Sequence, residues 1–291
     1  MDAGFTLGLV GLLIVIMLGI GLWVLKVVRM AEMSTLERFL FAIGLGSGVL
    51  ALIILGLIAG GWLKMPVAFC LIGVLIFFFG LPGITLLEQN LRNAGRVFKQ
   101  VFTAGIIEKL ILLAAVLILL LTFLHSLGPV TDYDGLMYHL PGPRAFLQAE
   151  SIELLPEMWQ ANGPLTGEML FTIGLVFGSD SSARLIHFSF ALFWLCGVYA
   201  LGKRFVNSNV GILAVLILFG TPMIFYWAQL AYIDYIWCFY ELLGFYGFLR
   251  WHETRRIGWL VLTGLSIGFA LGSKYLAIWS FSLPSNSRLN T

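Results

Sequence analysis

A series of apolar segments, each close to the length of a membrane span, constrains this chain more than any other feature. Eight of them cover roughly residues 5–28, 38–60, 64–86, 107–126, 182–202, 208–227, 230–250 and 258–281. About 20 residues of helix cross the ~30 Å hydrocarbon layer, and only a helix satisfies its backbone hydrogen bonds within one segment. The chain of 291 residues is 60% hydrophobic with a mean hydropathy of +0.97, which excludes a soluble domain. We therefore predict an all-α, polytopic membrane protein with about eight transmembrane helices.

The basic residues predict an orientation for these helices. If every segment spans, twelve of the seventeen Lys and Arg residues fall near loops on one side: Lys26, Arg29, Arg38, Arg92, Arg96, Lys99, Lys109, Lys203, Arg204, Arg250, Arg255 and Arg256. By the positive-inside rule this side is cytoplasmic, so the N-terminus is predicted outside. The natural location is a bacterial inner (plasma) membrane, with the first segment retained as an anchor because it lacks a basic start and a cleavage site. A net charge of +2 gives no reason to expect a nucleic-acid partner.

The longest polar interval, residues 127–181, is then one long periplasmic or extracellular loop. Pro141 and Pro143 interrupt it, so we expect short helices lying along the membrane surface. Its apolar stretch 164–178 has only 15 residues, which is short for a span and typical of a re-entrant or interfacial helix. Counting this stretch as a span would place the basic loops that follow it outside.

Two charged residues lie within apolar segments. Asp234 is near the outer start of the seventh segment, and Lys274 is in the outer half of the eighth. A charge at the centre of a membrane helix costs about 2.5–3.5 kcal/mol on insertion scales, so such residues usually face a cavity or a partner. The outer loop brings further polar groups to the same side: Asp132, Asp134, His139, Arg144, Glu157 and Glu168. We therefore predict one outer-facing site.

Each of these residues also has a structural interpretation. Lys274 can extend to the headgroups, and Asp234 can complement the dipole at the start of its helix. Asp132 and Asp134 can fix a turn, and a histidine such as His139 is more often a hydrogen-bonding residue than a ligand.

Four motifs, in order, resemble the GT-C membrane glycosyltransferases of the PMT-like branch, which includes protein mannosyltransferases and the lipid A aminoarabinose transferase. The outer TDYDGLMYHL contains an Asp followed by a Tyr four residues later, Asp134 and Tyr138. The stretch PLTGEMLFTIGLVFGSDSSARL matches a second motif, and AQLAYIDYIWCFY carries the second acid, Asp234. The fourth, GLSIGFALGSKYLAIW, contains Lys274 and Tyr275.

The resemblance implies transfer of a sugar from a polyprenyl-phosphate carrier to a protein, lipid or glycan acceptor at the outer face of the membrane. It implies Asp134 as the catalytic residue, acting as general base on the acceptor or through a divalent metal, with Asp132 as its rival. Donor binding would involve Asp234 and Tyr138, with Lys274 or Arg144 as the cation for the phosphate. Glu168 and His139 would hold a divalent metal ion, the one cofactor expected.

The resemblance also divides the chain. Residues 1–106, three helices and a basic cytoplasmic loop, precede the family-like core of residues 107–291. Family members usually continue through further helices, so the C-terminal part of the family fold is expected to be missing. Two alternatives remain open: a transporter or flippase in which Asp234 and Lys274 line the substrate path, and a non-catalytic membrane scaffold.

Overall fold

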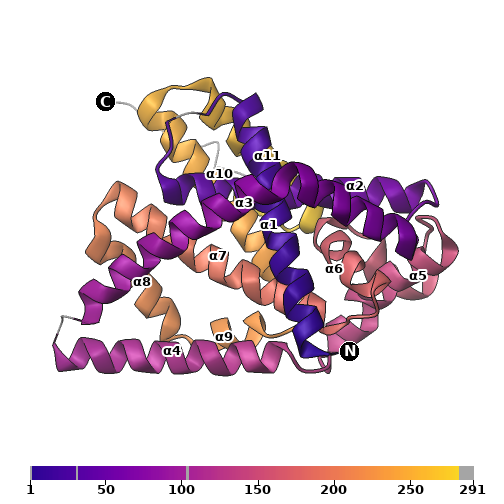
Figure 1. Cartoon of the computed structure of the whole chain (residues 1–291), viewed down its shortest axis with the longest axis horizontal. Helices are drawn as coiled ribbons and strands as arrows, with labels where there is room; N and C mark the ends of the chain where they lie inside the picture. The colour runs from indigo at the N-terminus through magenta and orange to yellow at the C-terminus, as the bar shows by residue number, and fades with distance from the viewer. Residues whose placement is uncertain (1, 31, 103–104, 282–291) are drawn as a thin grey trace.

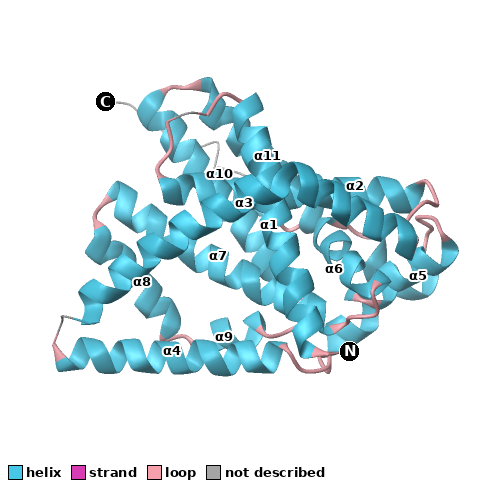
Figure 2. Cartoon of the chain, in the orientation of Figure 1, coloured by secondary structure: helices cyan, strands magenta, loops and turns pink. Residues whose placement is uncertain are grey.

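The computed structural model describes residues 2–30, 32–102 and 105–281. Throughout these residues the regular elements are helices, with no strand among them (Figure 2). The predicted all-α class is therefore confirmed. Five helices are long and apolar enough to cross a membrane: α1 (Ala3–Val27), α2 (Thr35–Ala59), α3 (Met65–Phe102), α4 (Ile106–Ser126) and α7 (Ser181–Phe205).

The predicted count of eight spans is not confirmed, because two of the predicted segments form broken helices and a third forms a continuous helix that is not among the five. Residues 208–227 form α8 (Ser208–Phe219) and α9 (Pro222–Ala228), which meet at 77° and make a sixth span if counted together. Thr221 is extended (φ −102°, ψ 101°) because a residue before proline disfavours the helical region.

The last two predicted segments, 230–250 and 258–281, contain Asp234 and Lys274. The seventh becomes α10 (Asp234–Thr254), and the eighth divides into α11 (Ile257–Ser273) and α12 (Ala277–Phe281). At the break Lys274 is extended (φ −154°, ψ 131°). Irregular backbone at membrane depth is tolerated where it is covered by protein or lines a cavity, so this break is a natural place for a site.

The loop 127–181 is largely helical. It contains a π-helical turn η1 (Gly135–His139), α5 (Pro141–Ala149), a 3₁₀ segment η2 (Pro156–Asn162) and α6 (Thr166–Val176). The 15-residue apolar stretch thus forms an 11-residue helix, too short to span. Eight consecutive residues of α6, Gly167–Gly174, are buried, because α2, α5 and α7 surround it. This helix therefore lies inside the protein.

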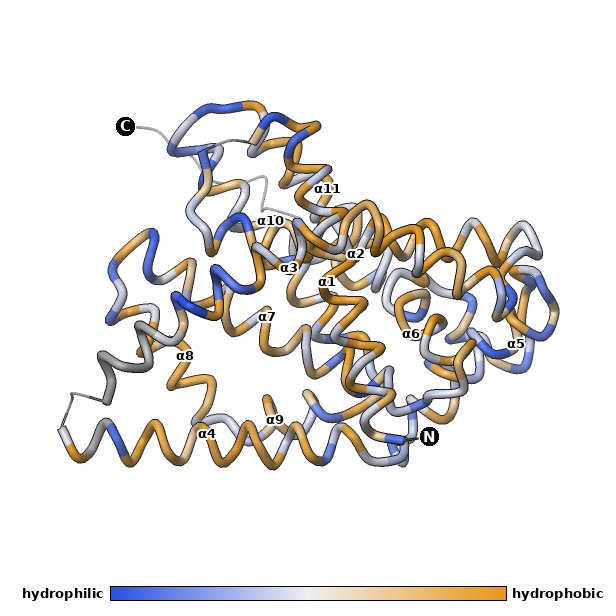
Figure 3. The backbone as a smooth tube through the Cα atoms, in the orientation of Figure 1, coloured by the Kyte–Doolittle hydropathy of each residue, from blue (hydrophilic) through white to orange (hydrophobic). Residues whose placement is uncertain are grey.

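Helix α2 is the most deeply buried of the five long helices. It packs against α1 and α3 and also against α6, α7, α10 and α11 (Figure 1). Helix α4, by contrast, runs along one edge and is mostly exposed, as expected of a helix that faces lipid. Hydrophobic residues follow α1, α2 and α4, and hydrophilic residues gather in the connections (Figure 3).

The connections gather at two ends of the bundle. At one end, Thr6 near the start of α1 hydrogen-bonds Ser179 (Oγ1–Oγ 2.8 Å), and Lys64 pairs with Glu150 (Nζ–Oε1 2.9 Å). The N-terminus and the loop between α2 and α3 therefore meet the loop 127–181, the grouping that the charge pattern predicts for one side.

The opposite grouping appears at the other end. Arg256 pairs with Glu32 (Nη1–Oε2 2.5 Å), and Arg204 pairs with Glu253 (Nη2–Oε2 3.1 Å). These contacts join the connections after α1, α7 and α10, which the basic residues assign to a common side.

Candidate functional site

An ion pair connects the break after α11 to the start of α10. The ammonium of Lys274 donates to Asp234 (Nζ–Oδ1 2.7 Å), and the side chains are 34% and 17% exposed. The Trp237 ring covers the ammonium, with its centroid 5.3 Å from Nζ. Asp234 is also the first residue of α10, where an acid complements the helix dipole. Lys274 is therefore held against a carboxylate and an indole rather than extended toward the headgroups.

A second pair of side chains lies nearby in the outer loop. The carboxylate of Asp134 lies close enough to the Tyr138 hydroxyl to raise the pKa of that hydroxyl. Burial is the largest cause of this raised pKa, followed by the interaction with Asp134 and then by the charge of Asp234. The tyrosine is thus kept neutral beside Asp134, and the charge of Asp234 also reaches it.

Tyr232, in the connection before α10, borders the same acids. Burial raises its pKa first, and the charges of Asp134 and Asp132 add to the increase. Its ring lies 5.6 Å from that of His139 and 5.6 Å from that of Trp227. Aromatic and acidic side chains of the outer loop and of the connection before α10 are therefore close together.

Asp132, the predicted rival of Asp134, fixes the backbone. Its Oδ2 accepts the Gly135 N–H (2.9 Å), and its Oδ1 accepts the Ala231 N–H (3.3 Å). A Cβ at Gly135 would lie 2.1 Å from the same Oδ2, so the turn requires a glycine. Both oxygens of Asp132 thus accept backbone N–H groups, one within the outer loop and one in the connection before α10, which favours Asp134 as the acid that meets a substrate.

His139 and Glu168 form a buried pair below this turn. His139 Nδ1 lies 2.8 Å from Glu168 Oε1, and the two residues are 3% and 7% exposed. Glu168 Oε2 is buried and has no hydrogen-bond partner among the described residues.

The arrangement around this pair does not suit a metal ion. Within the described part of the chain, no three His, Cys, Asp or Glu residues converge as metal ligands. The nitrogen and oxygen that the sequence offers as two metal ligands are joined to each other by a hydrogen bond. The divalent metal ion expected from the resemblance thus remains a prediction without a matching donor set.

Arg144, the second cation predicted for donor binding, lies in a different environment. It pairs with Asp180, and each side chain is 42% exposed. This contact joins α5 to the residue that precedes α7. Lys274 is therefore the cation that the structure brings to the acids, whereas Arg144 fastens the outer loop.

Arg184 organises the surroundings of the site, a role that sequence reasoning did not predict. An arginine at the start of an apolar helix usually anchors it at the headgroups, but Arg184 is only 2% exposed. Its guanidinium donates to the carbonyls of Gln229 (Nε–O 2.6 Å) and Pro129 and approaches His125 (Nη2–Nδ1 2.6 Å). The only sequence signal is an arginine with a histidine three residues later in an apolar helix.

His187 continues this framework toward Asp234. Its Nδ1 lies 2.9 Å from the Leu230 carbonyl, and its Nε2 accepts the Tyr235 N–H (3.0 Å). These two contacts require a proton on Nδ1 and none on Nε2, which is the neutral imidazole. A buried neutral histidine therefore fixes the first turn of α10, where Asp234 stands.

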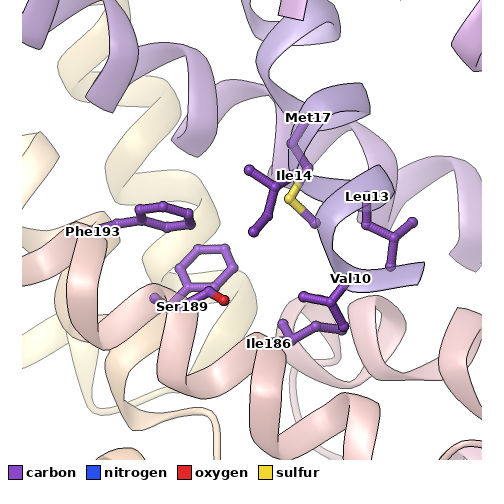
Figure 4. Close-up of a pocket in the computed structure, with 8 residues that line it drawn as sticks. Val10, Leu13, Ile14, Met17, Ile186, Ser189 and Phe193 are labelled. Atoms are coloured by element: carbon purple, nitrogen blue, oxygen red, sulfur yellow. The ribbon is translucent and has the colours of Figure 1, made fainter. Parts of the chain in front are cut away.

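An apolar crevice between α1 and α7 lies apart from these charges (Figure 4). It is lined by Val10, Leu13, Ile14, Met17, Ile186, Ser189, Phe190 and Phe193. Its one hydroxyl, on Ser189, already donates to the Leu185 carbonyl (2.8 Å). The crevice offers no group for catalysis, so the candidate site consists of the two pairs Asp234–Lys274 and Asp134–Tyr138.

Comparison with known families supports the resemblance. Residues 164–281 match the family model described as dolichyl-phosphate-mannose-protein mannosyltransferase. This stretch is PMT-like. The PMT-like stretch contains Glu168, Asp234 and Lys274 and begins after Asp134. No curated protein and no solved structure matches the chain.

Proposed function

We propose that this protein is a membrane glycosyltransferase that moves a sugar from a polyprenyl-phosphate carrier to an acceptor at the outer face of the inner membrane. The observation that carries the proposal is the Lys274–Asp234 ion pair within the PMT-like stretch, next to Asp134 and Tyr138. The acceptor would be a protein, a lipid or a glycan.

The reaction needs a proton acceptor and a stabiliser of negative charge. The acceptor hydroxyl oxygen forms a bond to the anomeric carbon, and the bond from that carbon to the phosphate oxygen breaks. The electron pair of the broken bond stays on the phosphate, and the hydroxyl proton passes to a carboxylate. A positioned base of this kind contributes about 10²–10⁴-fold to the rate.

Asp134 is our candidate for the base. It is the residue immediately before η1, and the neutral Tyr138 one turn later lies beside its carboxylate. Lys274 is our candidate for the cation, because a fixed ammonium stabilises the charge that grows on the leaving phosphate. Its pairing with Asp234 keeps the ammonium in place before a donor arrives, so little reorganisation is needed.

The decisive experiment is the substitution Asp134→Asn. Membranes that contain the protein are supplied with a labelled polyprenyl-phosphate mannose, and transfer of label to endogenous acceptors is measured. We expect a loss of at least about 100-fold, because the amide keeps the size of the carboxylate but cannot take the proton. The matched control is Glu157→Gln, which neutralises an exposed acid of the same outer loop and should leave the rate unchanged.

Wild-type transfer by the Asp134→Asn protein would refute this assignment of the base. Movement of the labelled donor across sealed proteoliposomes, with no glycosyl product formed, would refute the transferase and favour the transporter alternative.

A further inference from the structure

A second cavity lies at the end of the bundle opposite the two acid pairs. It measures about 420 Å³ and lies between the end of α1 and the start of α11. Its lining consists of Val28, Arg29, Met30, Glu32, Arg256, Ile257, Gly258 and Trp259. None of these residues takes part in the reaction proposed above.

The two arginines that line this cavity differ in their partners. Arg256 is paired with Glu32 (Nη1–Oε2 2.5 Å), which accounts for the one acid of the lining. Arg29 is exposed, and its side chain has no hydrogen bond or ion pair with any residue that the structure describes. The backbone of Arg29 is left-handed (φ 61°) as the chain leaves α1. The cavity therefore has an unpaired guanidinium and a net positive lining.

The floor of the cavity is apolar. Trp259 is 1% exposed and is covered on its other side by Arg250, whose guanidinium carbon lies 4.9 Å from the ring centroid. Val28 and Met30 are half-buried, and Ile257 is 70% exposed at the rim. A ligand that suits these walls has an anionic end and an adjoining apolar part.

We propose that this cavity binds the phosphate of an anionic membrane lipid, with Arg29 and Arg256 as its cationic contacts. Guanidinium groups bind phosphate oxygens through paired hydrogen bonds. Basic pockets between membrane helices are a recognised type of lipid-headgroup site, particularly on the cytoplasmic side. The cavity lies where α1 ends, which is the level of the headgroups if α1 spans the membrane. The positions of the basic residues predict that this end of α1 is cytoplasmic.

The test compares two lipids and three proteins. The purified full chain is equilibrated in mixed micelles with either phosphatidylglycerol or phosphatidylcholine, and retained lipid is counted by native mass spectrometry. We expect the wild type to retain phosphatidylglycerol in preference to phosphatidylcholine. We expect Arg29→Gln to weaken this binding about fivefold, the effect of one basic residue near an anionic headgroup. The matched control is Arg255→Gln, which removes the same charge from the neighbouring loop but lies outside the cavity lining, over the Trp251 ring.

A second variant tests the cavity without changing the charge. Ile257→Trp places a larger side chain at the rim and should also reduce retention of phosphatidylglycerol. The proposal is overturned if Arg255→Gln weakens binding as much as Arg29→Gln, because attraction would then be a property of the whole basic end. Equal retention of the two lipids by the wild type would overturn it as well. A third result would also overturn it: inorganic phosphate alone raises the Tm, Arg29→Gln abolishes that rise, and phosphatidylglycerol is not retained in preference to phosphatidylcholine. The site would then bind free phosphate and not a lipid.

Discussion

At the scale of single residues, the structure shows how a membrane helix accommodates a charge. Lys274 and Asp234 come from different helices, and each provides the counter-charge that the other needs in a partly buried place. An unpaired ion at this depth would be costly, whereas a pair in contact reduces the penalty. The two residues should therefore behave as a unit in stability measurements.

A double-mutant cycle measures this coupling. Lys274→Met and Asp234→Asn should each lower the free energy of unfolding in detergent, and the double variant should lose less than the sum of the two. We expect a coupling energy of about 1–3 kcal/mol, as found for residues in direct contact. Lys203→Met is a suitable control, because that lysine is exposed and lies over the Tyr199 ring instead of an acid. Strict additivity of the two losses would show that the ion pair contributes nothing to stability.

The sequence was most informative for residues that are rare in their surroundings. Asp234 and Lys274 stand out because charges seldom occur in apolar helices, and the structure joins them directly. Arg184 did not stand out, because an arginine at the end of a span is equally suited to headgroups. Its actual role depends on the carbonyls of Pro129 and Gln229, which lie more than 40 residues away on either side. Only the folded chain brings those acceptors together.

At the scale of elements, hydropathy predicts which segments are apolar but not where a helix ends. The segment 208–227 contains Pro222, and its bend there follows from the chemistry of proline. The segment 258–281 contains no such signal at Lys274, yet α11 ends there. The break follows from long-range contacts, since the lysine that ends the helix is the one paired with Asp234.

Close packing of α1 against α2 depends on glycines, which leads to a testable prediction. A Cβ at Gly46 would lie 1.7 Å from the Met17 carbonyl oxygen, so Gly46→Ala must push the two helices apart. We expect a loss of about 1–3 kcal/mol in the free energy of unfolding, the usual cost of overpacking. Thermal unfolding followed by tryptophan fluorescence in detergent gives the measurement.

Gly56 is the matched control on the same helix. A Cβ there meets nothing within 4 Å, so Gly56→Ala should be neutral or should gain up to about 1 kcal/mol from the better helix propensity of alanine. Equal stability of the two variants would mean that α1 and α2 do not approach as closely as the structure shows.

At the scale of the whole molecule, the N-terminal helices are part of the core. The sequence divides the chain at residues 106 and 107, and the family match begins at residue 164. Nevertheless α2 packs against α6, α7, α10 and α11, four helices that lie wholly inside the PMT-like stretch. Similarity in sequence therefore covers less of the chain than the packing that positions the candidate site.

A buried charge network joins α2 to α10 and tests this view. Glu37 is 4% exposed, and its Oε1 lies 2.9 Å from Arg250 Nε and accepts the Tyr246 hydroxyl (3.0 Å). The substitution Glu37→Gln would keep the size of the side chain but leave Arg250, 7% exposed, with Glu253 as its remaining counter-charge. We expect a loss of about 2–3 kcal/mol, somewhat below the cost of leaving a buried ion with no partner.

The contrast with Glu253 makes the prediction specific to the buried contact between α2 and α10. Glu253 also pairs with Arg250 (Oε2–Nη1 2.6 Å) within α10 and with Arg204 of α7 (Oε2–Nη2 3.1 Å), but its side chain is 37% exposed. Glu253→Gln should therefore cost no more than about 1 kcal/mol, as is usual for exposed ion pairs. If α2 belongs to the core, Glu37→Gln should lower the Tm of the whole chain in one cooperative transition. A separate early transition confined to the N-terminal helices would show instead that they fold as an independent unit.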